Sequence, residues 1–127
     1  MKRALLVVSF VLAASLGRGD AQHLQHNVTS KDVTVIGEVI DPVCYLGHDN
    51  WGKEHVACAK ECLTKEINLG ILEDKTDQLY ISLPVDHTNP NAKLKNFIAA
   101  KVKVTGTVYS KGGLQGIYVK NVEPLEE

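Results

Sequence analysis

The sequence lacks several features that would indicate common classes of function. No arginine follows Arg18. Arginine is the side chain that most often reads phosphates and bases with paired hydrogen bonds, so its absence argues against a nucleic-acid-binding protein. The chain also contains no Gly-x-Ser-x-Gly nucleophile motif, no glycine-rich phosphate loop and no CxxCH haem motif. These absences favour a protein that is not an enzyme.

Long apolar runs are also lacking. The longest, Ala4 to Leu16, has thirteen residues, whereas a membrane-spanning helix needs about 20. This run follows Lys2 and Arg3 and precedes small residues, which is the pattern of a secretory signal peptide. We expect a signal peptide over residues 1–21 with cleavage after Ala21, and therefore a periplasmic or secreted protein that has no membrane span after cleavage.

The remainder of the chain has the size of one domain. Of the 14 basic and 15 acidic residues, the signal peptide removes three and one, which leaves 11 and 14 and a net charge of −3. About 100 residues can bury one modest core. Residues 22–32 are polar and without periodicity, so we expect a flexible leader there and a folded domain over residues 33–127.

From Val33 onward, alternating apolar residues predict β-strands. The first strand starts at Val33 and contains Gly37, and the fourth contains Gly106; glycines inside strands suit bends or bulges. The remaining alternating segments predict three more strands, over residues 69–72, 79–83 and around 117–119. The chain is therefore expected to be mainly β, with five strands.

Two helices are predicted between these strands. Asn89 as N-cap, Pro90 at the first helical position and Leu94 at helical spacing predict a helix between strands three and four. Residues 51–66 predict a cysteine-bearing helix inserted between strands one and two. This order is that of the OB-fold, a small five-stranded Greek-key barrel. The inserted helix lies in the loop that commonly helps an OB-fold to bind its ligand.

The inserted helix carries the residues with the clearest chemical potential. His55, Cys58 and Cys62 are spaced so that they share one stripe of a helix. Cys44 lies in "DPVCYLGHDN", a segment that could cover this stripe. Three thiolates and one imidazole suit Zn(II), and sulfur ligands also suit Cu(I). We therefore predict a metal site formed by these four residues, with His48 as a spare or replacement ligand.

Other uses of the cysteines remain open. Cysteines of exported proteins usually pair, and a bridge from Cys44 to Cys58 or Cys62 would clamp the helix to the barrel. A Cys58 to Cys62 bridge is less favourable, because same-face β-carbons of a helix lie about 5 to 6 Å apart and a disulfide needs about 3.8 Å. A clamped domain would suit an interaction module for another envelope protein. Thiol exchange is weaker, since the chain has no CxxC motif, and buried reduced thiols are a fourth possibility.

The order of several short motifs is also informative. "GEVIDPVCYL", "HVACAKEC", "LGIL", "LYISL", "VKVTGTV" and "KGGLQGI" lie in this order between Val33 and Val122. They resemble a group of small exported bacterial proteins with an OB-fold-like domain and a helical insertion containing Cys and His. The resemblance implies that Cys44, His55, Cys58 and Cys62 belong to one site, and it implies no activity.

Overall fold

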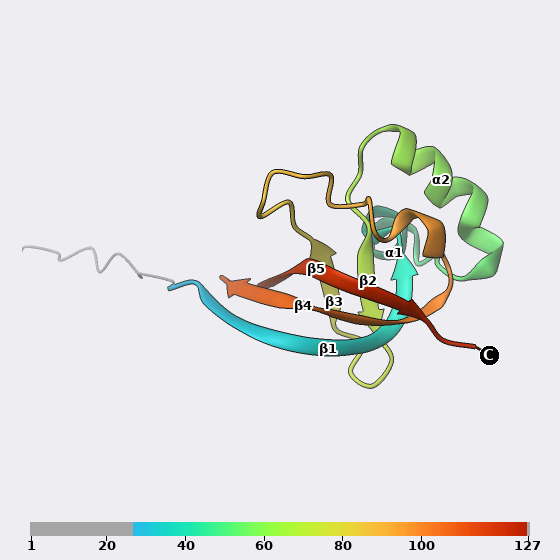
Figure 1. Ribbon diagram of the computed structural model, residues 1–127. Helices are drawn as coiled ribbons and strands as arrows, with labels where there is room; N and C mark the ends of the chain where they lie inside the picture. Colours follow the sequence, from blue (N-terminus) through green and yellow to red (C-terminus); the bar gives the residue numbers. More distant parts are fainter. Residues whose placement is uncertain (1–26, 127) are drawn as a thin grey trace, which may run out of the picture.

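The structure is a computed structural model that describes residues 27–126. Five strands form a closed barrel in the order β1-β2-β3-β5-β4. Figure 1 labels these strands and the insertion that follows β1. Neighbouring strands are antiparallel except β3 and β5, which are parallel. The strands are β1 (Thr29–Ile40), β2 (Gly70–Glu73), β3 (Leu79–Ser82), β4 (Lys101–Lys111) and β5 (Leu114–Pro124). The predicted mainly β, OB-fold-like barrel is confirmed, while the predicted signal peptide lies outside the described residues.

Strand β1 closes the barrel because it has two partners. Its first ten residues pair with β4, and residues 37–40 pair with β2. Gly37 belongs to both ladders, opposite Glu73 and Val102. A β-carbon on Gly37 would lie 2.1 Å from the Leu72 carbonyl oxygen, so only glycine lets the β2 backbone approach this closely. The glycine at the predicted bend therefore allows one strand to serve two neighbours.

The core lies inside the barrel and follows the predicted alternation. In β4 every second residue from Val102 to Val108 is buried, and the residues between them are partly exposed. The core comprises Val35, Val39, Leu69, Ile71, Leu94, Val102, Val104, Val108, Ile117 and Val119. Full burial of one such side chain contributes about 1.5 to 3 kcal/mol, so these residues supply the main stabilisation of the fold.

The first strand begins earlier than predicted, at Thr29 rather than Val33. The additional residues up to Asp32 pair with β4 but have exposed side chains. Asp32 Oδ1 accepts hydrogen bonds from Thr107 Oγ1 at 2.6 Å and from Lys120 Nζ at 2.8 Å. The backbone ladder and these polar contacts hold the segment without burying its side chains. Its sequence therefore shows no apolar alternation.

The predicted helix between β3 and β4 is much shorter than expected. Its only helical part is one 3-10 helix, Lys95–Phe97, preceded by turns. The Asn89 side chain accepts a hydrogen bond from the Asn91 amide at 2.8 Å, as an N-cap would. The Asn91 side chain, however, bonds to the segment that follows the inserted helix. These tertiary contacts hold the segment as turns that place Leu94 in the core.

The insertion between β1 and β2 contains two α-helices instead of one. Helix α1 (Pro42–His48) occupies the segment expected to be a covering loop, and a 3-10 helix (Lys53–His55) leads into α2 (Val56–Thr64). In Figure 1 both α-helices lie at the end of the barrel where β1 ends. Within residues 27–126, no helix combines the length and apolar character needed to cross a bilayer.

Candidate metal centre

Three sulfur atoms meet where α1 faces α2. Cys44 comes from α1, whereas Cys58 and Cys62 come from successive turns of α2. Cys44 Sγ lies 3.7 Å from Cys58 Sγ and 4.0 Å from Cys62 Sγ. All three sulfurs lie within 4.8 Å of one another. The tertiary structure thus brings together the three predicted sulfur ligands.

The sulfur separations have the size of a metal–thiolate site. All three cysteines are free thiols, and their separations are well beyond the about 2.05 Å of a disulfide bond. A metal about 2.3 Å from each sulfur, in tetrahedral or trigonal geometry, places the sulfurs about 3.8 to 4.0 Å apart. The observed distances therefore accommodate such an ion with little movement of the helices.

Helix α1 begins after an N-cap residue, Asp41, which is a residue type that favours this position. Asp41 precedes the helix, and its Oδ1 accepts hydrogen bonds from the amides of Val43 at 2.8 Å and Cys44 at 3.4 Å. Pro42 occupies the first helical position, where its missing amide proton and fixed φ are favourable. This cap fixes the first turn of α1, and with it the buried Cys44.

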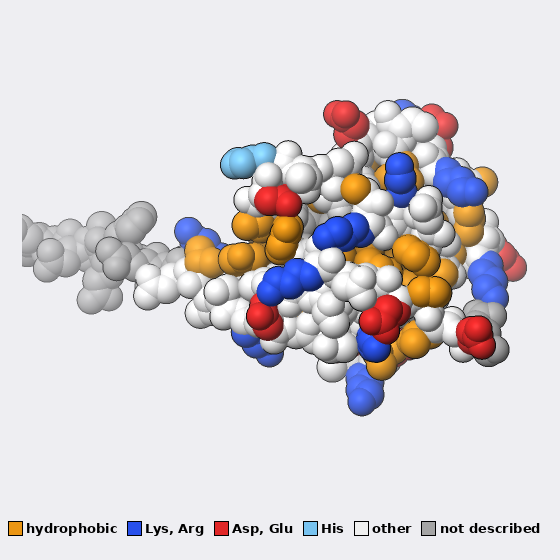
Figure 2. All heavy atoms as spheres, in the orientation of Figure 1, with side chains coloured by type: hydrophobic (Ala, Val, Ile, Leu, Met, Phe, Trp, Pro, Cys, Tyr) orange, Lys and Arg blue, Asp and Glu red, His pale blue; other side chains and the backbone are white. Residues whose placement is uncertain are grey.

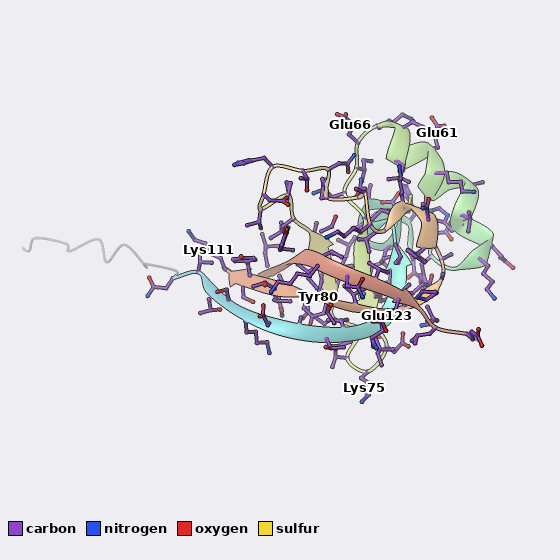
Figure 3. The ribbon with its side chains drawn as sticks, in the orientation of Figure 1. Glu61, Glu66, Lys75, Tyr80, Lys111 and Glu123 are labelled. Atoms are coloured by element: carbon purple, nitrogen blue, oxygen red, sulfur yellow. The ribbon has the colours of Figure 1, made fainter. Side chains whose placement is uncertain are left out.

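Helix α2 packs on the barrel through a narrow apolar side. Ala59 is buried and Leu63 is partly buried against the core. Cys58 and Cys62 each precede one of these residues, so both thiols lie beside the packed side rather than in it. Figure 3 shows Glu61 and Glu66 pointing away from the barrel at the C-terminal end of the insertion. The thiols therefore lie between the packed side of α2 and its solvated side.

A second group of donor atoms shares Cys44 with the sulfur group. The ligand atoms of Asp41, Cys44 and His55 lie within 4.8 Å of one another, and all three residues are buried. Asp41 Oδ2 and His55 Nε2 are buried without a hydrogen-bond partner of ordinary geometry, although the thiols of Cys44 and Cys62 lie close enough to Asp41 to affect its pKa. Buried polar atoms almost always have partners, so an unpaired oxygen and an unpaired ring nitrogen beside a thiol require an explanation. A bound cation would satisfy both, and the donor set fits one.

The remaining predicted ligands are placed differently. His48 is the last residue of α1, is exposed and belongs to neither donor group. His55 groups with Cys44 and Asp41, but not with Cys58 or Cys62. Within residues 27–126, the ligand atoms of all four predicted residues therefore do not lie within 4.8 Å of one another. Asp41 was not predicted as a site residue. Its signal was the Asp-Pro pair that starts α1 one turn before Cys44.

The thiols and the carboxylate influence one another electrostatically. Burial, followed by the neighbouring Asp41, raises the pKa of the Cys44 thiol well above its ordinary value. Contact with Asp41, followed by burial, raises the pKa of the Cys62 thiol. Burial alone would raise the pKa of Asp41, but polar contacts with the Cys62 and Cys44 thiols and with backbone amides outweigh it and lower the pKa. Without a cation, the carboxylate form of Asp41 and the protonated forms of the Cys44 and Cys62 thiols are thus favoured.

The barrel also has an apolar groove away from the cysteines. It measures about 480 Å³ and is lined mainly by Val28, Ile81, Leu83, Tyr109 and Leu114. The groove lies where β1 begins and β4 turns into β5, whereas the insertion follows the other end of β1. Figure 2 shows hydrophobic side chains gathered near the start of β1. This groove carries no metal-ligating side chain, so it is separate from the cysteine site.

No family model matches the chain, and comparisons with curated proteins and with solved structures find no match either. The resemblance to exported bacterial OB-fold-like proteins therefore stays a prediction. The interpretation of the site depends on its own geometry: three sulfurs at metal–thiolate distances, with a buried imidazole and a buried carboxylate beside one of them.

Proposed function

We propose that the protein is a small exported domain that binds one Cu(I) or Zn(II) ion and has no catalytic activity. The thiolates of Cys44, Cys58 and Cys62 hold the ion, and His55 supplies a fourth ligand when the ion is Zn(II). The observation that carries this proposal is the sulfur group, with Cys44 Sγ at 3.7 Å and 4.0 Å from its two neighbours. Export is supported by the signal-like pattern before residue 22.

The donor set favours soft metals. Thiolates select Cu(I) and Zn(II) over Mg(II) and Ca(II), which prefer oxygen ligands. Thiols must lose their protons to bind, so uptake of the ion should release protons and stabilise the fold. A cation would also neutralise the thiolates that Asp41 disfavours in its absence. Burial and Asp41 favour the protonated thiols when no ion is bound, so uptake of the ion must displace their protons, and metal affinity should rise with pH.

The contribution of His55 should distinguish binding of Zn(II) from binding of Cu(I). Structural Zn(II) sites are four-coordinate, so His55 must turn from Asp41 toward Cys58 and Cys62 to complete a zinc site. Cu(I) is satisfied by three thiolates. We therefore expect His55→Ala to weaken Zn(II) binding strongly and Cu(I) binding little. His48→Ala is the matched control, because His48 is exposed and belongs to neither donor group.

The direct test combines a thiol count with metal analysis on one sample. Mature protein prepared without oxygen is examined by native mass spectrometry before and after incubation with Zn(II) or Cu(I). We expect one ion per chain and three titratable thiols once the ion is removed. A chain that takes up neither ion and carries a disulfide between two of its cysteines would refute the proposal.

A second candidate is a disulfide-clamped interaction module for another envelope protein. The observation that favours it is again the short distance from Cys44 Sγ to Cys58 Sγ, from which a modest movement would form a bridge. The insertion also exposes the apolar side chains of Val43, Leu46 and Trp51. In this case Cys44→Ser should destabilise the oxidised fold whether or not metal is present. An unchanged melting temperature would count against it.

A further inference from the structure

The three cysteine residues of the site differ in their exposure to solvent. Cys44 is buried, Cys62 is partly exposed and Cys58 is exposed. Yet Cys44 Sγ lies almost equally far from the other two sulfurs. An ion bound among them would therefore be covered on the Cys44 side and would meet solvent on the Cys58 side.

The covered side is also the side that holds the other donor atoms. His55 Nε2 and Asp41 Oδ2 are buried, and both residues group with Cys44. Closed structural zinc sites enclose the ion with four protein ligands, whereas sites that react keep one position open. Here the described residues provide three sulfurs in one compact group that includes the exposed residue Cys58, and His55 would have to turn to become a fourth ligand, so four donors do not enclose the ion from the start. This arrangement suits an ion that is passed on more than an ion that is permanently enclosed.

We propose that the site exchanges its metal with thiol acceptors in solution, and that exchange begins at Cys58. This inference rests on the proposed metal-binding function. The acceptor thiol loses its proton and its sulfur forms a bond to the ion. The bond from the ion to Cys58 Sγ then breaks, and the Cys58 thiolate takes up a proton. No electrons are transferred, and the ion remains bound to Cys44 and Cys62 until a second acceptor thiol repeats the exchange.

The first experiment follows release of the ion from the metal-loaded mature chain. Glutathione is the acceptor, and a chromophoric chelator in excess reports the released Zn(II) or Cu(I). We expect the initial rate to increase in proportion to the glutathione concentration, because the acceptor attacks the bound ion. A rate that is independent of glutathione would overturn the proposal, since the ion would then leave before the acceptor arrives.

The second experiment uses glutathione to replace a missing ligand. In Cys58→Ala the vacated position opens to solvent, so glutathione should restore much of the lost metal affinity. In Cys44→Ala the vacated position is buried, so glutathione should restore little. Cys62→Ala is the comparison within α2 if Cys44→Ala does not fold, and circular dichroism checks the fold of each variant. Equal restoration in the exposed and the buried variant would overturn the assignment to Cys58.

The two proposals fail in different ways. If the unmodified chain takes up neither ion, the metal-binding function is refuted and the exchange is refuted with it. If the chain binds the ion but glutathione neither accelerates release nor restores Cys58→Ala, only the exchange is refuted. Metal uptake by the unmodified chain is therefore measured first.

Discussion

The side chain of Asn91 joins the insertion to the barrel, and its removal should destabilise the fold measurably. Asn91 is buried, and its Oδ1 accepts a hydrogen bond from the Leu69 amide at 2.7 Å. Its Nδ2 donates to the Ile67 carbonyl at 2.8 Å. Ser82 Oγ lies 3.4 Å from the same Oδ1. The side-chain amide of Asn91 thus connects residues 67–69, which follow α2, with Ser82 at the end of β3.

The expected magnitude follows from the groups that lose their partner. In Asn91→Ala the buried Leu69 amide loses its acceptor, and an unsatisfied buried donor costs about 1 to 3 kcal/mol. The Ile67 carbonyl is partly buried, so losing its donor costs about 0.5 to 1.5 kcal/mol. Together the free energy of unfolding should fall by about 1.5 to 4.5 kcal/mol. That is a large part of the 5 to 15 kcal/mol typical of a domain.

The measurement is urea unfolding of the reduced, metal-free protein. Asn89→Ala is the matched control, because Asn89 is exposed and its side chain accepts one hydrogen bond, from the Asn91 amide. We expect a loss of about 1 kcal/mol or less for this control. If the two variants lose equal stability, the bridging role of Asn91 is refuted.

Three further predictions concern the bend of β1, the cap of α1 and the thiols. Gly37→Ala should lower the free energy of unfolding by about 3 kcal/mol or more through overpacking. Gly47→Ala is the control and should not lower it, because a β-carbon there meets open space. Equal effects of the two variants in thermal unfolding would contradict this prediction. Asp41→Ala should lower the free energy of unfolding by about 1 kcal/mol, because it removes the N-cap of α1. Asp41→Asn should retain most of this stability, since Asn is also a good N-cap. Equal losses of the two variants in urea unfolding would show that the cap contributes nothing. Because the folded pKa values of Cys44 and Cys62 are raised, their stabilising contribution is present below the ordinary thiol pKa of about 8.5 and is lost as pH rises above it. Urea unfolding of the metal-free protein from neutral to alkaline pH checks this, and stability that does not decline there would contradict it.

The candidate site was partly predictable from the sequence. The spacing of Cys58 and Cys62 predicts one helix stripe, and α2 carries both. His55 falls on the same predicted stripe, but it lies in a 3-10 helix before α2 and groups with Asp41. A different type of helix rotates a side chain away from the position expected of a continuous α-helix. The stripe was therefore predictable for the sulfurs and not for the imidazole.

The part of the site that precedes α2 depends on contacts between distant residues. Sequence patterns did not predict α1, because seven residues are too few for a clear helical period, although Asp41 and Pro42 carry the cap signal. Cys44 is separated from Cys58 by 14 positions and from Cys62 by 18 positions along the chain. Only packing of α1 against α2 could set these distances.

The sequence alone determined the class of fold and the chemistry that the protein can use. Alternating valines and isoleucines determine which strand faces are buried, and glycines such as Gly37 determine where the barrel bends. Three cysteines and no arginine after Arg18 determine which ligands are offered. The tertiary structure decided which donors meet, because sulfur separations and burial depend on the packing of α1, α2 and the barrel. It left Cys58 at the surface and Cys44 buried, a difference that follows from this packing and that residue spacing does not encode.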